Sequence, residues 1–424
     1  MRLLSSLVLT LLVLAAGLLL APGQALASPA DPPHAVSKGS PSESSSLESS
    51  LRESSSPGRV IAERVVSEAA TYRIVQVAEG LERPWAIAFL PDGRLLVSER
   101  PGRLNLIMPD GRRTALEGLP PIHAQNQGGL LDVVLHPDYA ANGWIYFTYS
   151  SPGDNDSVTS DARRGTGTAL ARARLSADGT RLVDLETLYA QMPRHNPGRH
   201  YGGRIAFPGD GTVLFTIGDR GLRWPSQDLT DPAGSVIRLR EDGGVYPGNP
   251  FVGMAPGNLR PEIFSFGHRN SQGMIVAPDG AIWAHEHGAY GGDVLFIYEA
   301  GRNYGWPQVS FGTEYSTREK IGVGREAPGV EAPVYVWERA IAPSGLALYS
   351  GSAFPGWQGN LFVGSLVQKQ LRRLTLDGRR VVSEETLVDD QIGRIRDVRQ
   401  GPDGLLYLVT DEEDGGVYRL EPAS

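Results

Sequence analysis

The sequence predicts an all-β protein: a six-bladed β-propeller with four-stranded blades, its ring closed by the N- and C-terminal strands. A turn built on Pro, Gly or Asp joins two apolar stretches six times along the chain. These units recur at intervals of roughly 45 to 75 residues, as expected of four-stranded blades with insertions. The chain also has 52 Gly and 31 Pro among its 424 residues and shows no long amphipathic helical pattern, which suits an all-β fold rich in turns.

Each repeat consists of an apolar stretch, a turn and a second apolar stretch. The turns and the strands that follow them are Pro91-Asp92-Gly93 before Leu95–Val97, His136-Pro137-Asp138 before Trp144–Phe147, Pro208–Gly211 before Val213–Ile217, Pro278-Asp279-Gly280 before Ala281–Trp283, Pro355-Gly356 before Leu361–Val363, and Pro402-Asp403-Gly404 before Leu405–Val409. Arg73–Val77 and Gly416–Leu420 read as strands at the two ends of the domain. We expect them to share one blade, because that pairing removes an exposed sheet edge.

The N-terminal segment, residues 1–27, has the pattern of a secretory signal peptide. Arg2 precedes the apolar run Leu3–Leu20, and Ala25-Leu26-Ala27 is a small-x-small cleavage pattern. A permanent membrane anchor is the alternative interpretation. After cleavage we expect no stable membrane span and a periplasmic or secreted protein. The chain contains no cysteine, so disulfides do not stabilise it.

Residues 28–59 are rich in Ser, Pro and Glu and are predicted to be a disordered linker, because they have too few large apolar side chains to form a core. The propeller domain is predicted to span residues 60–424. The formal net charge of −8 argues against a nucleic-acid partner. No Gly-rich phosphate loop lies between a strand and a helix, which disfavours a nicotinamide cofactor. The sequence does not determine the oligomeric state.

Five segments carry polar residues that strand packing does not need. Each lies beside the apolar strand of a different blade, so ring closure would bring the segments together in one composite site. They are Asn126–Gly129, Arg199–Arg204, Gly267–Asn270, His285–Ala289 and Arg394–Asp397.

His200 is the best candidate for a general base, since a neutral imidazole accepts a proton near neutral pH. Asp219 ends the strand that follows, and a hairpin would return it towards His200, where its carboxylate could orient the ring. The alternative is a histidine that caps a loop beside a turn-forming aspartate. Spacing alone does not decide between the two.

Two basic elements suit an anionic ligand. Arg269 and Asn270 follow an apolar strand, and a guanidinium there can stabilise an anionic oxygen, although it could instead bond blade carbonyls. Arg394 and Arg396 alternate around Ile395 and face one side of a strand, which suits a polycarboxylate. Salt bridges to Asp397 or Asp389 are the alternative.

The loop from Glu286 to Asp293 contains glycines that allow backbone carbonyls to turn inward, and hard cations such as Ca²⁺ bind such oxygens. His285 and His287 lack a third neighbouring ligand, so zinc is disfavoured. The acidic run Asp411–Asp414 is expected to be a solvated loop.

In this order, the segments resemble the soluble pyrroloquinoline quinone (PQQ)-dependent aldose sugar dehydrogenases of the glucose/sorbosone dehydrogenase family. The resemblance covers about residues 74–420. Its most specific motifs are Gln127–Leu131, His200–Arg204, Gly267–Asn270, Gln272-Gly273, Glu286–Gly288, Gly291–Asp293, Asn303–Pro307 and Arg394–Val398.

This resemblance implies a quinoprotein oxidoreductase. Such an enzyme oxidises the anomeric carbon of aldose sugars to lactones, transfers hydride to PQQ and passes electrons to an external acceptor. By position, it implies that His200 is the base and Asp219 its partner, while Arg269 polarises the quinone. Gln127, Asn270, Tyr315, Arg394 and Arg396 match cofactor contacts, and Gly288 and Ala289 match residues whose carbonyls hold Ca²⁺.

The chain departs from the family pattern at two positions. Val367 stands where the family usually has a lysine that contacts the cofactor, and Lys369 could substitute for it. Val294 stands where a glutamate, with a tyrosine matching Tyr304, forms a second calcium site in relatives. The alternative function is therefore a non-catalytic propeller that binds carbohydrate or protein and has lost PQQ.

Overall fold

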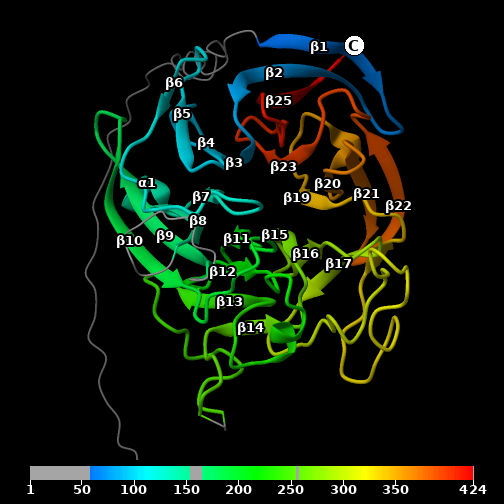
Figure 1. Cartoon of the computed structure of the whole chain (residues 1–424). Coiled ribbons are helices and arrows are strands. Elements are labelled where there is room, and N and C mark those ends of the chain that lie inside the picture. The colour runs from blue at the N-terminus through cyan, green and yellow to red at the C-terminus, as the bar shows by residue number, and fades with distance from the viewer. Residues whose placement is uncertain (1–57, 153–164, 255–256, 424) are drawn as a thin grey trace, which may run out of the picture. The chain divides into compact units, whose positions relative to one another are not determined.

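The computed structural model describes residues 58–152, 165–254 and 257–423. The chain divides into two units, residues 1–53 and 54–424, and every described residue belongs to the second unit. The predicted signal peptide and residues 28–57 of the predicted linker lie outside the described residues. In the described part, six antiparallel sheets form a ring, which confirms the predicted propeller (Figure 1). None of the helices in this part is long and apolar enough to cross a membrane.

We number the blades I to VI in the order of their innermost strands along the chain. Blade I contains β3 (Pro84–Phe89), β4 (Leu95–Glu99), β5 (Arg103–Ile107) and β6 (Arg113–Ala115). Blade II contains β7 (Leu130–Leu135), β8 (Ile145–Ser151), β9 (Gly167–Leu175) and β10 (Leu182–Ala190). Blade III contains β11 (Ile205–Ala206), β12 (Thr212–Ile217), β13 (Ser235–Arg240) and β14 (Ile263–Phe266).

The second half of the ring follows the same order. Blade IV contains β15 (Ser271–Val276), β16 (Ile282–Glu286), β17 (Asp293–Tyr298) and β18 (Tyr335–Trp337). Blade V contains β19 (Pro343–Leu348), β20 (Leu361–Ser365), β21 (Leu371–Asp377) and β22 (Arg380–Leu387). Blade VI contains β23 (Ile395–Gln400), β24 (Leu406–Thr410), β25 (Gly415–Pro422), β2 (Thr71–Leu81) and β1 (Arg59–Val66). The short helices are α1 (Tyr139–Asn142), η2 (Trp224–Gln227) and η3 (Pro355–Trp357).

The N-terminal strand β2 closes the ring by pairing with β25, as the sequence predicts. Ile74 lies opposite Leu420 in this antiparallel pair. The innermost strands contact one another in sequence around the ring, and the last, β23, contacts the first, β3. Strand β1 adds a fifth strand to blade VI that the sequence did not predict, because its side chains are mostly exposed and give no clear alternation.

The repeated Pro-Asp-Gly turns make the same hydrogen bonds in different blades. In blade I, Gly93 N donates to Leu90 O at 3.0 Å, and Gly93 adopts φ 85°. Gly280 in blade IV and Gly404 in blade VI repeat this bond at 2.9 and 3.0 Å, also with positive φ. Glycine adopts this backbone conformation without steric cost, so each turn fixes the same hairpin between the first and second strands.

The hydrophobic core is divided among the interfaces between blades. Six clusters of buried apolar side chains each join two neighbouring blades. Successive residues of β3 show how: Ala86 and Ala88 pack towards blade II, whereas Ile87 between them packs towards blade VI. Because side chains alternate along a strand, each blade contributes apolar residues to both of its interfaces.

A network of four charged side chains, three of them buried and one (Arg399) 22% exposed, joins the innermost strands. Arg204 Nη1 lies 2.9 Å from Asp397 Oδ1 and 3.3 Å from Asp132 Oδ1. Arg399 bonds the same two carboxylates, at 3.0 and 2.5 Å. Both aspartates are fully buried. Arg204 and Asp397 belong to polar segments that the sequence assigned to the functional site, and their actual role is to connect blades II, III and VI.

We expect Asp397→Ala to lower the free energy of unfolding by about 3–5 kcal/mol, because it leaves Arg204 and Arg399 to share the single buried carboxylate of Asp132. Urea unfolding monitored by tryptophan fluorescence measures the change. The control is Asp377→Ala, since Asp377 is a 70% exposed partner of Arg380 and its loss should have little effect. Equal stability of the two variants would contradict a structural role for the network.

Candidate active site

The predicted site residues lie at one edge of the ring, which we call the site rim. In every blade the first and second strands are antiparallel, so the start of the first strand and the end of the second lie at the same edge of the ring. In blade IV, for example, Ser271 at the start of β15 lies opposite Glu286 at the end of β16. Gln127, His200, Arg269, Asn270 and Arg394 precede first strands, whereas Asp219, His287 and Lys369 follow second strands. The structure therefore brings the predicted segments to one edge. The expectation that each belongs to a different blade is wrong for Gly267–Asn270 and His285–Ala289, which both lie at blade IV, before β15 and at the end of β16.

His200 and Asp219 form a close pair in blade III. His200 Nδ1 lies 2.6 Å from Asp219 Oδ1, and its side chain is 11% exposed. Gln127 Oε1 accepts a hydrogen bond from His200 N at 2.8 Å, and this contact holds the histidine at φ 55°. No described residue bonds His200 Nε2. The arrangement leaves one ring nitrogen available to a ligand while the carboxylate fixes the other.

The protonation states of this pair favour a neutral base. The pKa of His200 is lowered, mainly because the side chain is buried. The hydrogen bond to Asp219 opposes this shift, and the positive charge of Arg269 adds to it. Burial alone would raise the pKa of Asp219, but the His200 bond and the charges of His200 and Arg269 lower it overall. Near neutral pH, Asp219 is therefore a carboxylate and His200 a neutral imidazole that can accept a proton.

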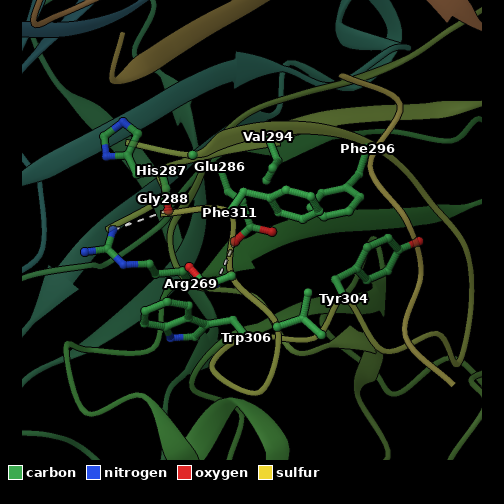
Figure 2. Close-up of a pocket in the computed structure, with 12 residues that line it drawn as sticks. Arg269, Glu286, His287, Gly288, Val294, Phe296, Tyr304, Trp306 and Phe311 are labelled. Atoms are coloured by element: carbon green, nitrogen blue, oxygen red, sulfur yellow. Dashed lines mark hydrogen bonds between the residues drawn. The ribbon is translucent and has the colours of Figure 1, made fainter. Parts of the chain in front are cut away.

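Arg269 lies beside this pair and is connected to it through Trp306. Trp306 Nε1 donates to Asp219 Oδ2 at 2.7 Å, and the Arg269 guanidinium carbon lies 5.3 Å from the centre of the Trp306 ring. Figure 2 shows the Arg269 side chain between Trp306 and the backbone of His287, whose carbonyl accepts a bond at 3.3 Å. Arg269 is 7% exposed and has no carboxylate partner among the described residues. A buried guanidinium of this kind is ready to bind an anionic oxygen.

Three further predicted cofactor contacts surround this group. Gln127 holds the backbone of His200, as described above. Asn270 is buried, and its Oδ1 accepts a hydrogen bond from Gly202 N at 3.2 Å. The Tyr315 hydroxyl accepts one from Arg269 Nη2 at 3.4 Å, while the tyrosine side chain is 57% exposed. Gln127 and Asn270 therefore hold the segment around His200, and Tyr315 covers Arg269 from the solvent side.

Arg394 and Arg396 share a carboxylate that the sequence assigned to a solvated loop. Asp411 Oδ2 lies 2.7 Å from Arg396 Nη2 and 3.2 Å from Arg394 Nη2. Asp411 is 3% exposed, so the solvated-loop prediction is wrong for this residue, and neither Asp397 nor Asp389 pairs with these arginines. Although burial raises the pKa of Asp411, the surrounding guanidinium groups lower it well below its usual range. Arg396 Nε is buried without a hydrogen-bond partner among the described residues.

The predicted replacement for the missing lysine is already engaged in an ion pair. Lys369 Nζ lies 3.1 Å from Asp390 Oδ1, and both side chains are largely exposed. Val367 is 59% exposed. At this part of the site rim, blade V therefore presents an apolar side chain and a cation that is paired with a carboxylate.

The loop after β16 is held in place by Asp293. Its Oδ1 accepts a bond from Gly288 N at 2.8 Å, and its Oδ2 accepts bonds from Ile341 N and Ala342 N, both at 2.8 Å. Burial raises the pKa of Asp293, and these three bonds oppose the rise. No described residue donates a hydrogen bond to the carbonyl oxygen of Gly288 or Ala289. Those carbonyls are the donor type that a hard cation requires.

The other residue predicted to bind metal, Tyr304, has its hydroxyl engaged elsewhere. That hydroxyl donates to Ile297 O at 2.9 Å and accepts from Glu299 N at 2.8 Å. Tyr304 lines a cavity of about 30 Å³ together with the charged Arg269 and Glu286 and the apolar Val294 and Phe311 (Figure 2). The described residues contain no group of three or more His, Cys, Asp or Glu side chains able to hold a metal ion.

Sequence reasoning missed two residues that organise the site. Trp306 anchors Asp219 and lies against Arg269, and Asp411 pairs the two blade VI arginines. The only sequence signal for Asp411 was its position at the end of a second strand, one residue after Thr410; Asp219 lies similarly, two residues after the end of β12. Trp306 belongs to the motif Asn303–Pro307, but nothing in the sequence indicated its contact with Asp219, which lies 87 residues away.

Comparison with known proteins places this geometry in a family. The glucose/sorbosone dehydrogenase family model matches residues 81–419. The chain belongs to this family. It is 39% identical over 357 residues to the aldose sugar dehydrogenase YliI of Escherichia coli, covering 83% of this chain and 94% of that protein. The family resemblance seen in the sequence is therefore confirmed.

Two solved structures share the fold over nearly their whole length. A glucose dehydrogenase crystal structure has a TM-score of 0.78 and 43% identity, covering 83% of this chain and 99% of that one. The PQQ-bound form of an aldose sugar dehydrogenase from Streptomyces coelicolor has a TM-score of 0.64 and 28% identity, covering 82% and 96%.

We expect the imidazole of His200 to titrate with a midpoint below about 6.5 in the cofactor-free protein, because burial disfavours its charged form. Arg269→Gln should raise this midpoint, since it removes a neighbouring positive charge. NMR of the ring carbons, assigned with a His200 variant, measures both values. Arg112→Gln alters a 78% exposed arginine and is the control. A midpoint that does not respond to Arg269→Gln would contradict the electrostatic coupling.

Proposed function

We propose that this family member is a quinoprotein that oxidises the anomeric carbon of aldose sugars to lactones. The observation that carries the proposal is the His200–Asp219 pair beside a buried Arg269, which has no carboxylate partner in the described part of the chain. A base next to an unpaired cation suits the removal of a proton from one atom while negative charge develops on another. The relatives named above as aldose sugar and glucose dehydrogenases support a sugar as the substrate.

His200 performs the proton transfer in this proposal. Its Nδ1 faces Asp219, so Nε2 is the atom that takes the proton of the anomeric hydroxyl. Asp219 stabilises the imidazolium that forms, and Trp306 and Gly221 N keep the carboxylate in place at 2.7 Å each. The sugar carbon loses a hydride as the hydroxyl loses its proton, which gives the lactone. PQQ, held by the arginines and polar side chains of the site rim, would supply the hydride acceptor, and an external acceptor would take up the two electrons.

Several residues of the site rim suit the binding of PQQ, a tricarboxylate with a quinone. Arg269 would lie against the quinone oxygen, where negative charge develops. Arg396 Nε is buried and has no hydrogen-bond partner among residues 58–152, 165–254 and 257–423, which supports a role for Arg394 and Arg396 in holding carboxylates. Gln127, Asn270, Tyr315 and Lys369 are the proposed polar contacts around the same ligand.

We further propose that the carbonyls of Gly288 and Ala289 hold a Ca²⁺ ion that binds together with the cofactor. Support comes from these oxygens accepting no hydrogen bond from the described residues. Asp293 also links Gly288 N of the loop to Ile341 N and Ala342 N. Tyr304 is the third residue assigned to metal binding, and its hydroxyl would have to exchange two backbone contacts for a cation.

We also propose that the protein is exported to the periplasm or secreted, with residues 1–27 as its signal peptide, residues 28–59 as a linker and residues 60–424 as the catalytic propeller. Support comes from the charged start, the apolar run and the cleavage pattern of the first residues. N-terminal sequencing of the exported protein tests the cleavage after Ala27.

We expect His200→Ala to lower turnover of aldoses by about 100-fold to 10,000-fold while PQQ stays bound, because proton transfer is lost and the Gln127 bond to the backbone remains. Reconstitution with PQQ and Ca²⁺, followed by dye reduction with several sugars, measures turnover, and absorption spectra measure bound cofactor. His136→Gln is the matched control, since His136 pairs with Glu241 at 3.1 Å near the opposite edge of the ring.

Two outcomes would overturn this assignment. Unimpaired turnover in His200→Ala would reject His200 as the base. If the absorption of PQQ does not change when wild-type protein is added, the propeller is instead a binding module for carbohydrate or protein. Val367, which replaces the family's cofactor-binding lysine, is the best support for this alternative.

We expect removal of Ca²⁺ with EDTA to lower the affinity for PQQ and to leave the melting temperature of the cofactor-free protein nearly unchanged, because Asp293 and Tyr304 are satisfied by backbone groups. Gly288→Ala should mimic this loss, since a Cβ there would lie 2.1 Å from Gly291 O and would displace the loop. Gly257→Ala is the control, as its Cβ would meet no atom within 4 Å. Equal PQQ affinity with and without Ca²⁺ would contradict the proposed cation site.

A further inference from the structure

Arg100 occupies a position on the site rim for which neither the sequence nor the family resemblance suggested a role. It directly follows β4, the second strand of blade I. In blades III, IV and VI, the residues near the corresponding strand ends are Asp219, His287 and Asp411, and all three lie in the site. The repeated hairpin geometry therefore places the side chain of Arg100 at the same edge of the ring.

The stem of Arg100 is fixed against the loop that positions His200. Leu130 N donates to Arg100 O at 3.2 Å. Gly129 adopts φ 148°, and a Cβ at that position would lie 2.6 Å from Arg100 Cγ and 1.8 Å from Arg100 O. Only glycine permits this contact. Arg100 is therefore held beside the segment of blade II that contains Gln127.

The guanidinium of Arg100 has no carboxylate partner in the described part of the chain. Burial lowers the pKa of this group, the charge of Asp411 raises it, and the charges of Arg396, Arg83 and Arg394 lower it further. Asp411 is already shared by Arg394 and Arg396. Arg83 pairs with Glu413 at 2.8 Å. The charges of Arg100, Arg394 and Arg396 all act on the buried carboxylate of Asp411, and of these three arginines only Arg100 has no ion pair with a described residue.

We propose that Arg100 binds a carboxylate of the quinone cofactor and supplies the cation that Val367 does not provide. This inference rests on the proposed function, because the ligand is the same PQQ. A guanidinium can bind a carboxylate through two parallel hydrogen bonds, so Arg100 would hold the cofactor from blade I as Arg394 and Arg396 hold it from blade VI. Arg100 acts here as a cofactor-binding residue and takes no part in proton transfer.

The test measures PQQ affinity directly, by titrating PQQ into the Ca²⁺-loaded protein and following cofactor fluorescence. We expect Arg100→Ala to weaken binding by about 10-fold to 100-fold, the loss of one charge-assisted contact, and Arg100→Lys to weaken it less. Arg112→Ala, in the same blade but 78% exposed and paired with Asp110, should bind as wild type does. Melting temperatures of all variants confirm that the fold is retained.

A double variant tests whether Arg100 replaces the missing lysine. Val367→Lys adds a cation at the position where the family usually has one, so Arg100→Ala with Val367→Lys should recover most of the lost affinity. Failure of this recovery, with each single variant folded, would overturn the idea that Arg100 replaces the missing lysine.

The remaining outcomes separate this inference from the proposed function. If wild-type protein binds PQQ and Arg100→Ala binds it equally well, only the role of Arg100 is rejected; if wild-type protein does not bind PQQ, both proposals are rejected. A further experiment compares the turnover of glucuronate, a sugar with a carboxylate, with the turnover of glucose, which has none. Selective loss of glucuronate turnover in Arg100→Ala, with PQQ affinity unchanged, would assign Arg100 to a substrate carboxylate and overturn the cofactor assignment.

Discussion

The largely buried network of Arg204, Arg399, Asp132 and Asp397 is the interaction on which the rest of the structure depends. It joins innermost strands of three blades, and Ile87 N of blade I and Gln272 O of blade IV add two more connections to it. Buried charges are costly unless each is paired and hydrogen-bonded, so this network has low energy only when the ring is assembled in one register. The relative positions of the blades, and with them the geometry of the site rim, follow from that requirement.

The site uses the geometry of the blade in a regular way. Every blade offers two positions at the rim, one before its first strand and one after its second, because the two strands are antiparallel. Blade III uses them for His200 and Asp219, blade IV for Arg269 and the loop of Gly288, and blade VI for Arg394 and Asp411. No single blade contains a complete site, so the proposed chemistry depends on ring closure as much as on the identity of the residues.

The site rim also contains features that do not favour stability by themselves. His200 adopts φ 55°, and Arg269 is buried without a carboxylate partner among the described residues. Left-handed backbone at a non-glycine residue and an unpaired buried charge both cost free energy. The surrounding contacts hold them in place: Gln127 for the backbone of His200, and Trp306 and Tyr315 for Arg269. Such features are expected where a ligand is to complete the set of interactions.

The sequence by itself determined the propeller and most of the candidate site residues. Both depend on local features: Pro-Asp-Gly turns fix hairpins over a few residues, and polar residues such as His200 stand out beside apolar strands. Only the tertiary structure decided the partners of those residues. Arg204 meets Asp397 across 193 residues, and Trp306 meets Asp219 across 87. Arg394 and Arg396 pair with Asp411, because β23 and β24 place the three side chains together. Ion-pair partners depend on distance in space, which for residues on different blades is fixed only when the ring closes.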